Sequence, residues 1–103
     1  MASFEGLIIE QRETFKQFRR ILPNYRKLGK ERFTLSKTNT RIDGLKELWS
    51  KCRALDVKIK QATTEAQRQH KYFGDSEFLN AEADFEDHLD QLLEIADYLG
   101  KQD

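Results

Sequence analysis

The stretch of sequence that decides the fold is RIDGLKELWSKCRALDVKI, residues 41–59. Its apolar residues recur every three or four positions, as one face of an α-helix requires. Asp56 interrupts the series before it resumes. This spacing places one apolar stripe along a helix and presents it to other helices. The residues of the stripe are Ile42, Leu45, Trp49, Cys52 and Ile59.

The same spacing returns near the C-terminus, at Phe78, Phe85 and Leu92, and a shorter apolar pattern opens the chain. We therefore predict an all-α fold in a single domain, residues 1–103: a three-helix antiparallel bundle with coiled-coil-like packing and a long central helix. Ser3 is a suitable N-cap for the first helix, and Pro23 should end that helix because its ring blocks continuation. The expected helices span residues 3–22, 34–71 and 76–99.

The long second helix raises a question of coverage. Thr34 or Ser36 is a suitable N-cap, although a competing interpretation starts the helix near Thr40. A helix over residues 34–71 would be roughly 55 Å long, and two shorter helices could not cover it evenly. Either the helix breaks near Gly44, or another chain covers part of its stripe. We favour self-association, and the alternative is a closed monomer in which the loops pack over the gap.

The net charge of zero conceals two halves of opposite sign. Residues 1–60 contain 15 Lys and Arg and 7 Asp and Glu, whereas residues 61–103 contain 3 and 11. Opposite charges attract either within one chain or between chains, and both possibilities favour assembly. The basic segment 19–41 also contains Tyr25 and Phe33, a combination compatible with binding single-stranded nucleic acid.

The sequence contains no set of residues that is typical of catalysis. P-loop, Rossmann, nucleophile-elbow and HExxH patterns are all missing. Asp84 and His88 lie one helical turn apart, but two ligands fall short of a structural zinc set. Cys52 lies on the apolar stripe, where a buried structural thiol is expected. We therefore predict a non-enzymatic protein with no cofactor, no metal and no small-molecule substrate.

The chain shows no run of about 18 apolar residues that could span a membrane, and its first residues do not form a signal peptide. We expect an intracellular, cytoplasmic protein, and the nucleus stays open as a second location. An anionic membrane surface is a less favoured partner than protein or nucleic acid.

One set of residues resembles a known family. The segment RIDGLKELW at 41–49, then HKYF at 70–73, and then Phe78, Glu82 and Phe85 are similar to the N-terminal helical region of Gag-like polyproteins from insect LTR retrotransposons, particularly the Bel/Pao group. The resemblance covers roughly residues 10 to 99. It implies a structural segment that acts in self-assembly or host-factor contact.

The chain contains no capsid-like region, zinc knuckle or protease, so the resemblance fits an excised domain or a host protein derived from such an element. Spectrin-like repeats are a rival analogy of similar length and helix number. Those repeats typically carry a buried Trp in the first helix, whereas Trp49 lies in the expected second helix.

From these observations we predict a helical assembly module that mediates self-association or docks a partner helix. The alternative is a nucleic-acid-binding arm. The residues expected at the helix interface are Leu45, Leu48, Trp49, Leu55, Ile59, Phe85 and Leu92. The residues expected to contact nucleic acid or an anionic surface are Arg19, Arg20, Arg26, Lys27, Lys30 and Arg32.

Overall fold

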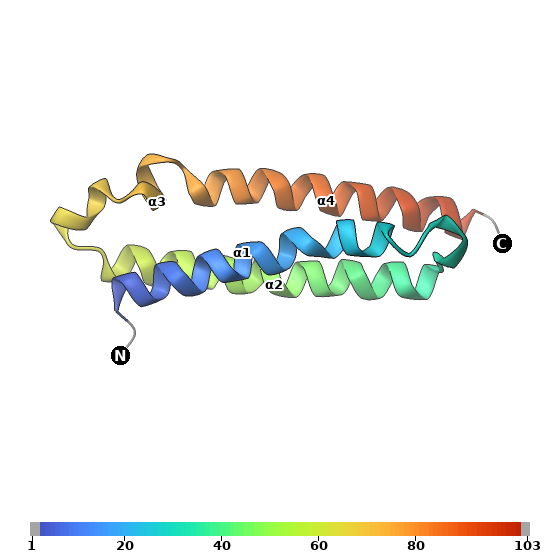
Figure 1. Cartoon of the computed structure of the whole chain (residues 1–103), viewed down its shortest axis with the longest axis horizontal. Coiled ribbons are helices and arrows are strands. Elements are labelled where there is room, and N and C mark those ends of the chain that lie inside the picture. The colour runs from blue at the N-terminus through green and yellow to red at the C-terminus, as the bar shows by residue number, and fades with distance from the viewer. Residues whose placement is uncertain (1–2, 102–103) are drawn as a thin grey trace.

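The computed structural model describes residues 3–101, and every regular element in that range is helical. The three long helices lie lengthwise side by side, and the short α3 lies at one end of the molecule (Figure 1). The predicted all-α class is confirmed, although residues 3–101 form four α-helices rather than three. In chain order the elements are α1 (Phe4–Arg26), the 3-10 turn η1 (Lys30–Arg32), α2 (Leu35–Ala62), the 3-10 turn η2 (Glu65–Gln69), α3 (Lys71–Gly74) and α4 (Glu77–Gly100).

Helix α1 begins as predicted but ends later. The Ser3 hydroxyl accepts a hydrogen bond from the backbone N–H of Gly6 at 3.0 Å. The prediction that Pro23 ends the helix is wrong, because α1 continues to Arg26. Packing of the next turn accounts for this: the buried Tyr25 ring stacks on Phe33, with 4.5 Å between the ring centroids. Tertiary contacts thus outweigh the missing backbone donor of the proline.

Helix α2 begins after Thr34, whose side chain accepts a hydrogen bond from the N–H of Lys37, as one of the two predicted N-caps should. The helix passes through Gly44 without a break. It ends at Ala62 rather than near residue 71, because Thr64 and Gln67 form a capping box that starts η2 instead.

Because α2 ends earlier than predicted, the other two long helices can cover its apolar stripe. Helices α1, α2 and α4 contain 23, 28 and 24 residues, so their lengths nearly match. The mismatch that favoured a second chain is therefore absent, and self-association needs independent support from the surface.

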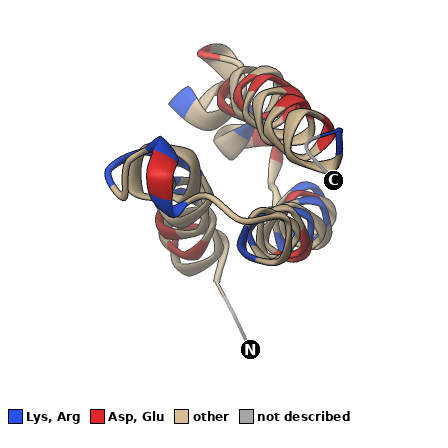
Figure 2. Cartoon of the chain, turned by 90° about the vertical axis from the view of Figure 1, so that its right-hand side faces the viewer, with Lys and Arg blue, Asp and Glu red and all other residues tan. Residues whose placement is uncertain are grey.

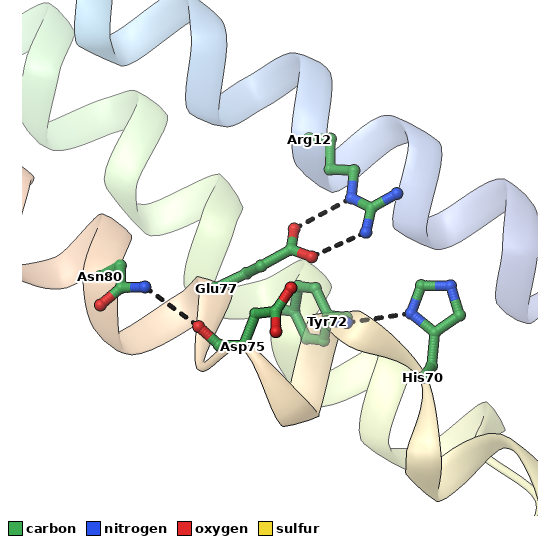
Figure 3. Close-up of polar contacts among 6 residues, drawn as sticks. All are labelled: Arg12, His70, Tyr72, Asp75, Glu77 and Asn80. Atoms are coloured by element: carbon green, nitrogen blue, oxygen red, sulfur yellow. Dashed lines mark hydrogen bonds and ion pairs between the residues drawn. The ribbon is translucent and has the colours of Figure 1, made fainter.

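The η2–α3 connection returns the chain to the start of α4. The N–H of Tyr72 donates to Nδ1 of His70 at 3.0 Å, and the side chain of Asn80 donates to the carbonyl of Asp75 at 3.0 Å (Figure 3). Ser76 occupies the N-cap position of α4 but makes no capping bond through its side chain. Its φ of 52° lies in the left-handed region, which costs a non-glycine residue about 1–2 kcal/mol.

The molecule is a rod with one continuous apolar core. Its principal extents are 56 × 24 × 19 Å, and its radius of gyration is 16.4 Å, against about 13 Å for a compact domain of 100 residues. Viewed end-on, α1, α2 and α4 occupy the corners of a triangle, with acidic residues concentrated on α4 (Figure 2). Core side chains that are completely inaccessible include Phe18, Leu45, Ile59 and Leu92.

Candidate functional site

The predicted interface residues lie mostly inside the chain's own core. Fully or nearly fully buried side chains cannot contact a second chain unless the helices separate, whereas half-buried ones retain accessible surface. Leu48 and Phe85 are half-buried. The buried members of the predicted set are Leu45, Trp49, Leu55, Ile59 and Leu92, of which Trp49 is the most exposed at 6%.

The opposite charges of the two halves meet along the seam between α1 and α4. Arg12 donates two hydrogen bonds to the carboxylate of Glu77, at 2.9 and 2.7 Å (Figure 3). Seven residues further along each helix, Arg19 donates to Asp84 at 2.8 Å. After another seven, Arg26 donates to the side chain of Gln91. This regular spacing shows that α1 and α4 run in the same direction, and that the halves attract within one chain.

The Arg12–Glu77 pair predicts a specific dependence on pH. The two hydrogen bonds from Arg12 lower the pKa of Glu77 from its ordinary value of 4.5. A carboxylate with a lowered pKa stabilises the folded state at pH values above the pKa that the group has in the unfolded chain. This contribution is lost as the pH falls through the lower pKa of the folded state. Both side chains are partly exposed, at 41% and 23%, so the effect should be no more than about 1 kcal/mol.

We therefore expect Glu77→Gln to be less stable than the unmodified chain at pH 7 and to lose less stability on acidification below pH 4.5. Urea titrations at pH 7 and at pH 3 measure this difference. Glu13→Gln is the matched control, because Glu13 is exposed and, among residues 3–101, forms an ion pair only with Lys16, three residues along the helix. Equal acid sensitivity of all three proteins would contradict the assignment.

The seam engages two of the six residues predicted to contact nucleic acid. Arg19 and Arg26 bind α4, whereas the other four basic side chains are exposed and form no ion pair within residues 3–101. The aromatic side chains of this segment also have partners: Tyr25 is buried and stacks on Phe33. What remains at this end of the rod is a set of exposed cations with one exposed ring, Tyr98, near Lys30. The cations are Arg20, Lys27, Lys30 and Arg32.

A second seam, between α2 and α4, is packed by aromatic rings, and a groove with an aromatic floor runs over its surface. The Trp49 ring stacks between Phe78 and Phe85, with ring centroids 5.1 and 4.9 Å apart and interplanar angles of 18° and 10°. The edge of Phe18 meets Trp49 from the core at 5.7 Å. The groove has a volume of about 690 Å³ and continues past Phe78 into two smaller hollows.

The two sides of this groove carry opposite charges that do not meet. Lys46 and Arg53 project from α2, and Glu82 and Glu86 project from α4, all four lining the groove. None of the four takes part in an ion pair with any residue from 3 to 101. Ion pairs therefore join α1 to α4 at Arg12 and Arg19, whereas the charges that line the α2–α4 groove stay unpaired within residues 3–101. Near Gln91 the α1–α4 seam itself contains a pocket of about 450 Å³.

Exposed apolar side chains flank the groove. Val57 on α2 is 53% exposed and Leu79 on α4 is 62% exposed, and each lines one of the hollows that adjoin Phe78. Leu93, at 45% exposed, lies seven residues beyond Glu86, and Leu79 lies seven residues before it. Residues seven apart share a helix face, so these leucines form a stripe along the α4 side of the groove.

A buried polar network beside the hollows that adjoin Phe78 was not predicted. The Gln11 side chain donates to the carbonyl of Cys52 at 2.7 Å and to the hydroxyl of Tyr72 at 3.2 Å. The Tyr72 hydroxyl donates in turn to Asp56 at 2.7 Å, and Lys60 pairs with the same carboxylate at 2.9 Å. Burial raises the pKa of Tyr72 well above its ordinary value of 10.0.

This network could have been anticipated from the two polar residues that interrupt apolar series, Gln11 in α1 and Asp56 in α2. Its geometry suits bracing rather than catalysis, because the acid, the hydroxyl and the amide bind one another. It ties the η2–α3 connection to α1 and α2.

The remaining residues that could carry chemistry are isolated. Burial raises the pKa of the Cys52 thiol to about 11, so the thiol stays protonated and unreactive near neutral pH. In the part of the chain that the structure describes, no three His, Cys, Asp or Glu side chains come together as metal ligands would. None of the helices there combines the length and hydrophobicity needed to cross a lipid bilayer. Comparisons with protein-family models, with curated proteins and with solved structures return no match for this chain.

Proposed function

We propose that this protein is a non-enzymatic helical assembly module, and that the groove between α2 and α4 receives a helix of another polypeptide. That polypeptide is either a second copy of the chain or a partner protein. In this proposal α1, α2 and α4 act as a three-helix antiparallel bundle, and α2 is shared by the core and the groove. Helices commonly dock in apolar grooves through residues one turn apart.

The observation that carries the proposal is the contrast between the two seams of α4. Ion pairs join α4 to α1 at Arg12 and Arg19, whereas the groove along α2 has an aromatic floor, unpaired charges on both sides and exposed Val57 and Leu79 beside it. A surface with an apolar centre and a charged rim resembles the usual anatomy of a protein–protein interface.

Site-specific photo-crosslinking tests this proposal. A photoreactive phenylalanine analogue is placed at Val57, beside the groove, and a matched one at Ile9 on α1, which is 65% exposed but not part of the groove. We expect a discrete adduct from Val57 in cells that produce the protein, no adduct from Ile9, and loss of the adduct when Arg53→Glu is added.

The partner side of the crosslink must map to one helix, and a probe returned to that helix must crosslink back to the groove. Equal crosslinking from both positions, or none from Val57, would contradict docking in the groove.

The resemblance to Gag-like polyproteins stays a prediction. If it holds, the groove would belong to a structural segment that assembles with other copies or with a host factor, and catalysis would not be expected of it.

Nucleic-acid binding is a second candidate function, favoured by the exposed cations at the η1 end. With Tyr25 and Phe33 stacked on each other and Tyr98 the exposed ring near Lys30, such binding would rest mainly on phosphate contacts and fall steeply with salt. Fluorescence anisotropy with a labelled single-stranded oligonucleotide at increasing salt tests it. Absence of binding at low salt, or binding unchanged by Lys30→Glu with Arg32→Glu, would remove this candidate.

A further inference from the structure

The charge pattern of the α2–α4 groove complements itself. One side is basic, with Lys46 and Arg53, and the other is acidic, with Glu82 and Glu86. A twofold axis brings the same surface of two copies into contact. Charged residues then meet opposite charges only if the surface is complementary to its own rotated copy. A groove with one basic and one acidic side meets this condition for one orientation of the axis.

We propose that the occupant of the groove is a second copy of this chain, related by a twofold axis that runs along the groove. Rotation about such an axis exchanges the two sides and keeps the long direction. The basic side of each copy then faces the acidic side of the other. An axis across the groove would instead place like charges opposite each other, which is costly. The inference rests on the proposed function, because it names the polypeptide that the groove receives.

This axis also fixes which helices meet. Because α2 and α4 run antiparallel within the chain, α2 of one copy lies antiparallel against α4 of the other. Trp49 lies level with the stretch of α4 between Phe78 and Phe85. Arg53 of one copy therefore lies nearer to Glu82 of the second copy than to Glu86. Lys46 lies nearer to Glu86 of the second copy. The four helices around the axis form the antiparallel arrangement common in four-helix bundles.

The size of the face is sufficient for a stable dimer. The rod is 56 Å long and 24 Å across. A standard interface buries about 800 Å² on each partner, so a contact along roughly two-thirds of one long face would reach it. Val57, Leu79 and Leu93 would become buried in this contact, which gives three of the large exposed apolar side chains a partner.

Two charge-reversed variants test the inference by sedimentation velocity. The first carries Lys46→Glu and Arg53→Glu, so that both sides of its groove are acidic. The second carries Glu82→Lys and Glu86→Lys, so that both sides are basic. We expect each variant alone to self-associate at least about 100-fold more weakly than the unmodified chain, because like charges now face each other. An equimolar mixture should form a heterodimer.

Matched controls reverse the same number of charges elsewhere. Arg20→Glu with Lys27→Glu, and Glu5→Lys with Glu31→Lys, change exposed residues on or beside α1 and η1, away from α2 and α4, that form no ion pair within residues 3–101. These controls should self-associate like the unmodified chain. Circular dichroism checks that every variant is folded.

The direction of the two copies is tested by spin labels at Arg32→Cys, at the η1 end of the rod. The native Cys52 need not be removed, because it is buried and its pKa is raised to about 11. An axis along the groove places both labels at the same end of the dimer. The measured distance should therefore be well below the 56 Å length of the rod, and a distance near or above that length would overturn the proposed axis.

The possible failures are distinguishable. A chain that stays monomeric, or a mixture of variants that fails to pair, would overturn the second copy as occupant. Docking of a different polypeptide would then still be supported by a mapped crosslink from Val57. Self-association that the groove variants leave unchanged would overturn both the second copy and the groove as the docking surface.

Discussion

Trp49→Ala is expected to lower the free energy of unfolding by about 3–5 kcal/mol. The indole is only 6% exposed and touches three rings: Phe18 through its edge, and Phe78 and Phe85 through stacking. Truncation removes these contacts and leaves a cavity where α1, α2 and α4 meet. Domains of this size have a total stability of about 5–15 kcal/mol, so the variant should be close to unfolding at 25 °C.

Urea denaturation followed by circular dichroism measures the loss, since Trp49 is the only tryptophan and its fluorescence disappears with it. The control is Trp49→Phe, which keeps a ring in the stack and should retain more than half of the lost stability. A Trp49→Ala variant within about 1 kcal/mol of the unmodified chain would show that the three helices do not share this core.

The second large effect is expected from Tyr72→Phe, which should lower the free energy of unfolding by about 1–3 kcal/mol. The change keeps the ring but removes the hydroxyl that donates to Asp56 and accepts from Gln11. Asp56 is 5% exposed, so one of its carboxylate oxygens would lose a partner that water cannot easily replace.

The same residue predicts behaviour at high pH. Because burial raises the folded-state pKa of Tyr72 above 10.0, its contribution is fully present below pH 10 and is lost as the pH rises beyond that value. Tyr72→Phe should lack this alkaline loss. Tyr98→Phe is the control, because Tyr98 is 64% exposed and the change should alter stability by less than about 0.5 kcal/mol. Equal stability of Tyr72→Phe and Tyr98→Phe would contradict the bracing role of the network.

The spacing of apolar residues and the N-cap residues predicted the helices correctly where interactions between neighbouring residues determine them. The heptad spacing of Leu45, Trp49 and Cys52 does mark a buried stripe, and the side chains of Ser3 and Thr34 do cap their helices. The predictions were wrong where contacts between residues distant in the sequence, or a second local motif, determine where a helix ends.

Helix α1 continues past Pro23 because Tyr25 in its next turn is buried. Helix α2 ends earlier than the apolar pattern suggested because Thr64 and Gln67 form a capping box. That capping box was visible in the sequence as TEAQ, residues 64–67.

The candidate site was predicted less well, for a physical reason. Spacing identifies a helix face but not whether that face is covered within the chain or by another chain. Leu55 and Leu92 were expected at an interface and lie in the core instead. The packing angle of the helices decides which acidic side chains of α4 pair with α1 and which stay unpaired. The spacing of residues in the sequence does not determine this angle.

The most direct test of a second copy in the groove is the solution mass by light scattering across a concentration series. The chain has a mass of 12.2 kDa. We expect the mass of the unmodified chain to rise toward twice that value with concentration, and the mass of the Lys46→Glu, Arg53→Glu variant to stay at 12.2 kDa over the same range. A mass of 12.2 kDa for the unmodified chain at every concentration would contradict the claim.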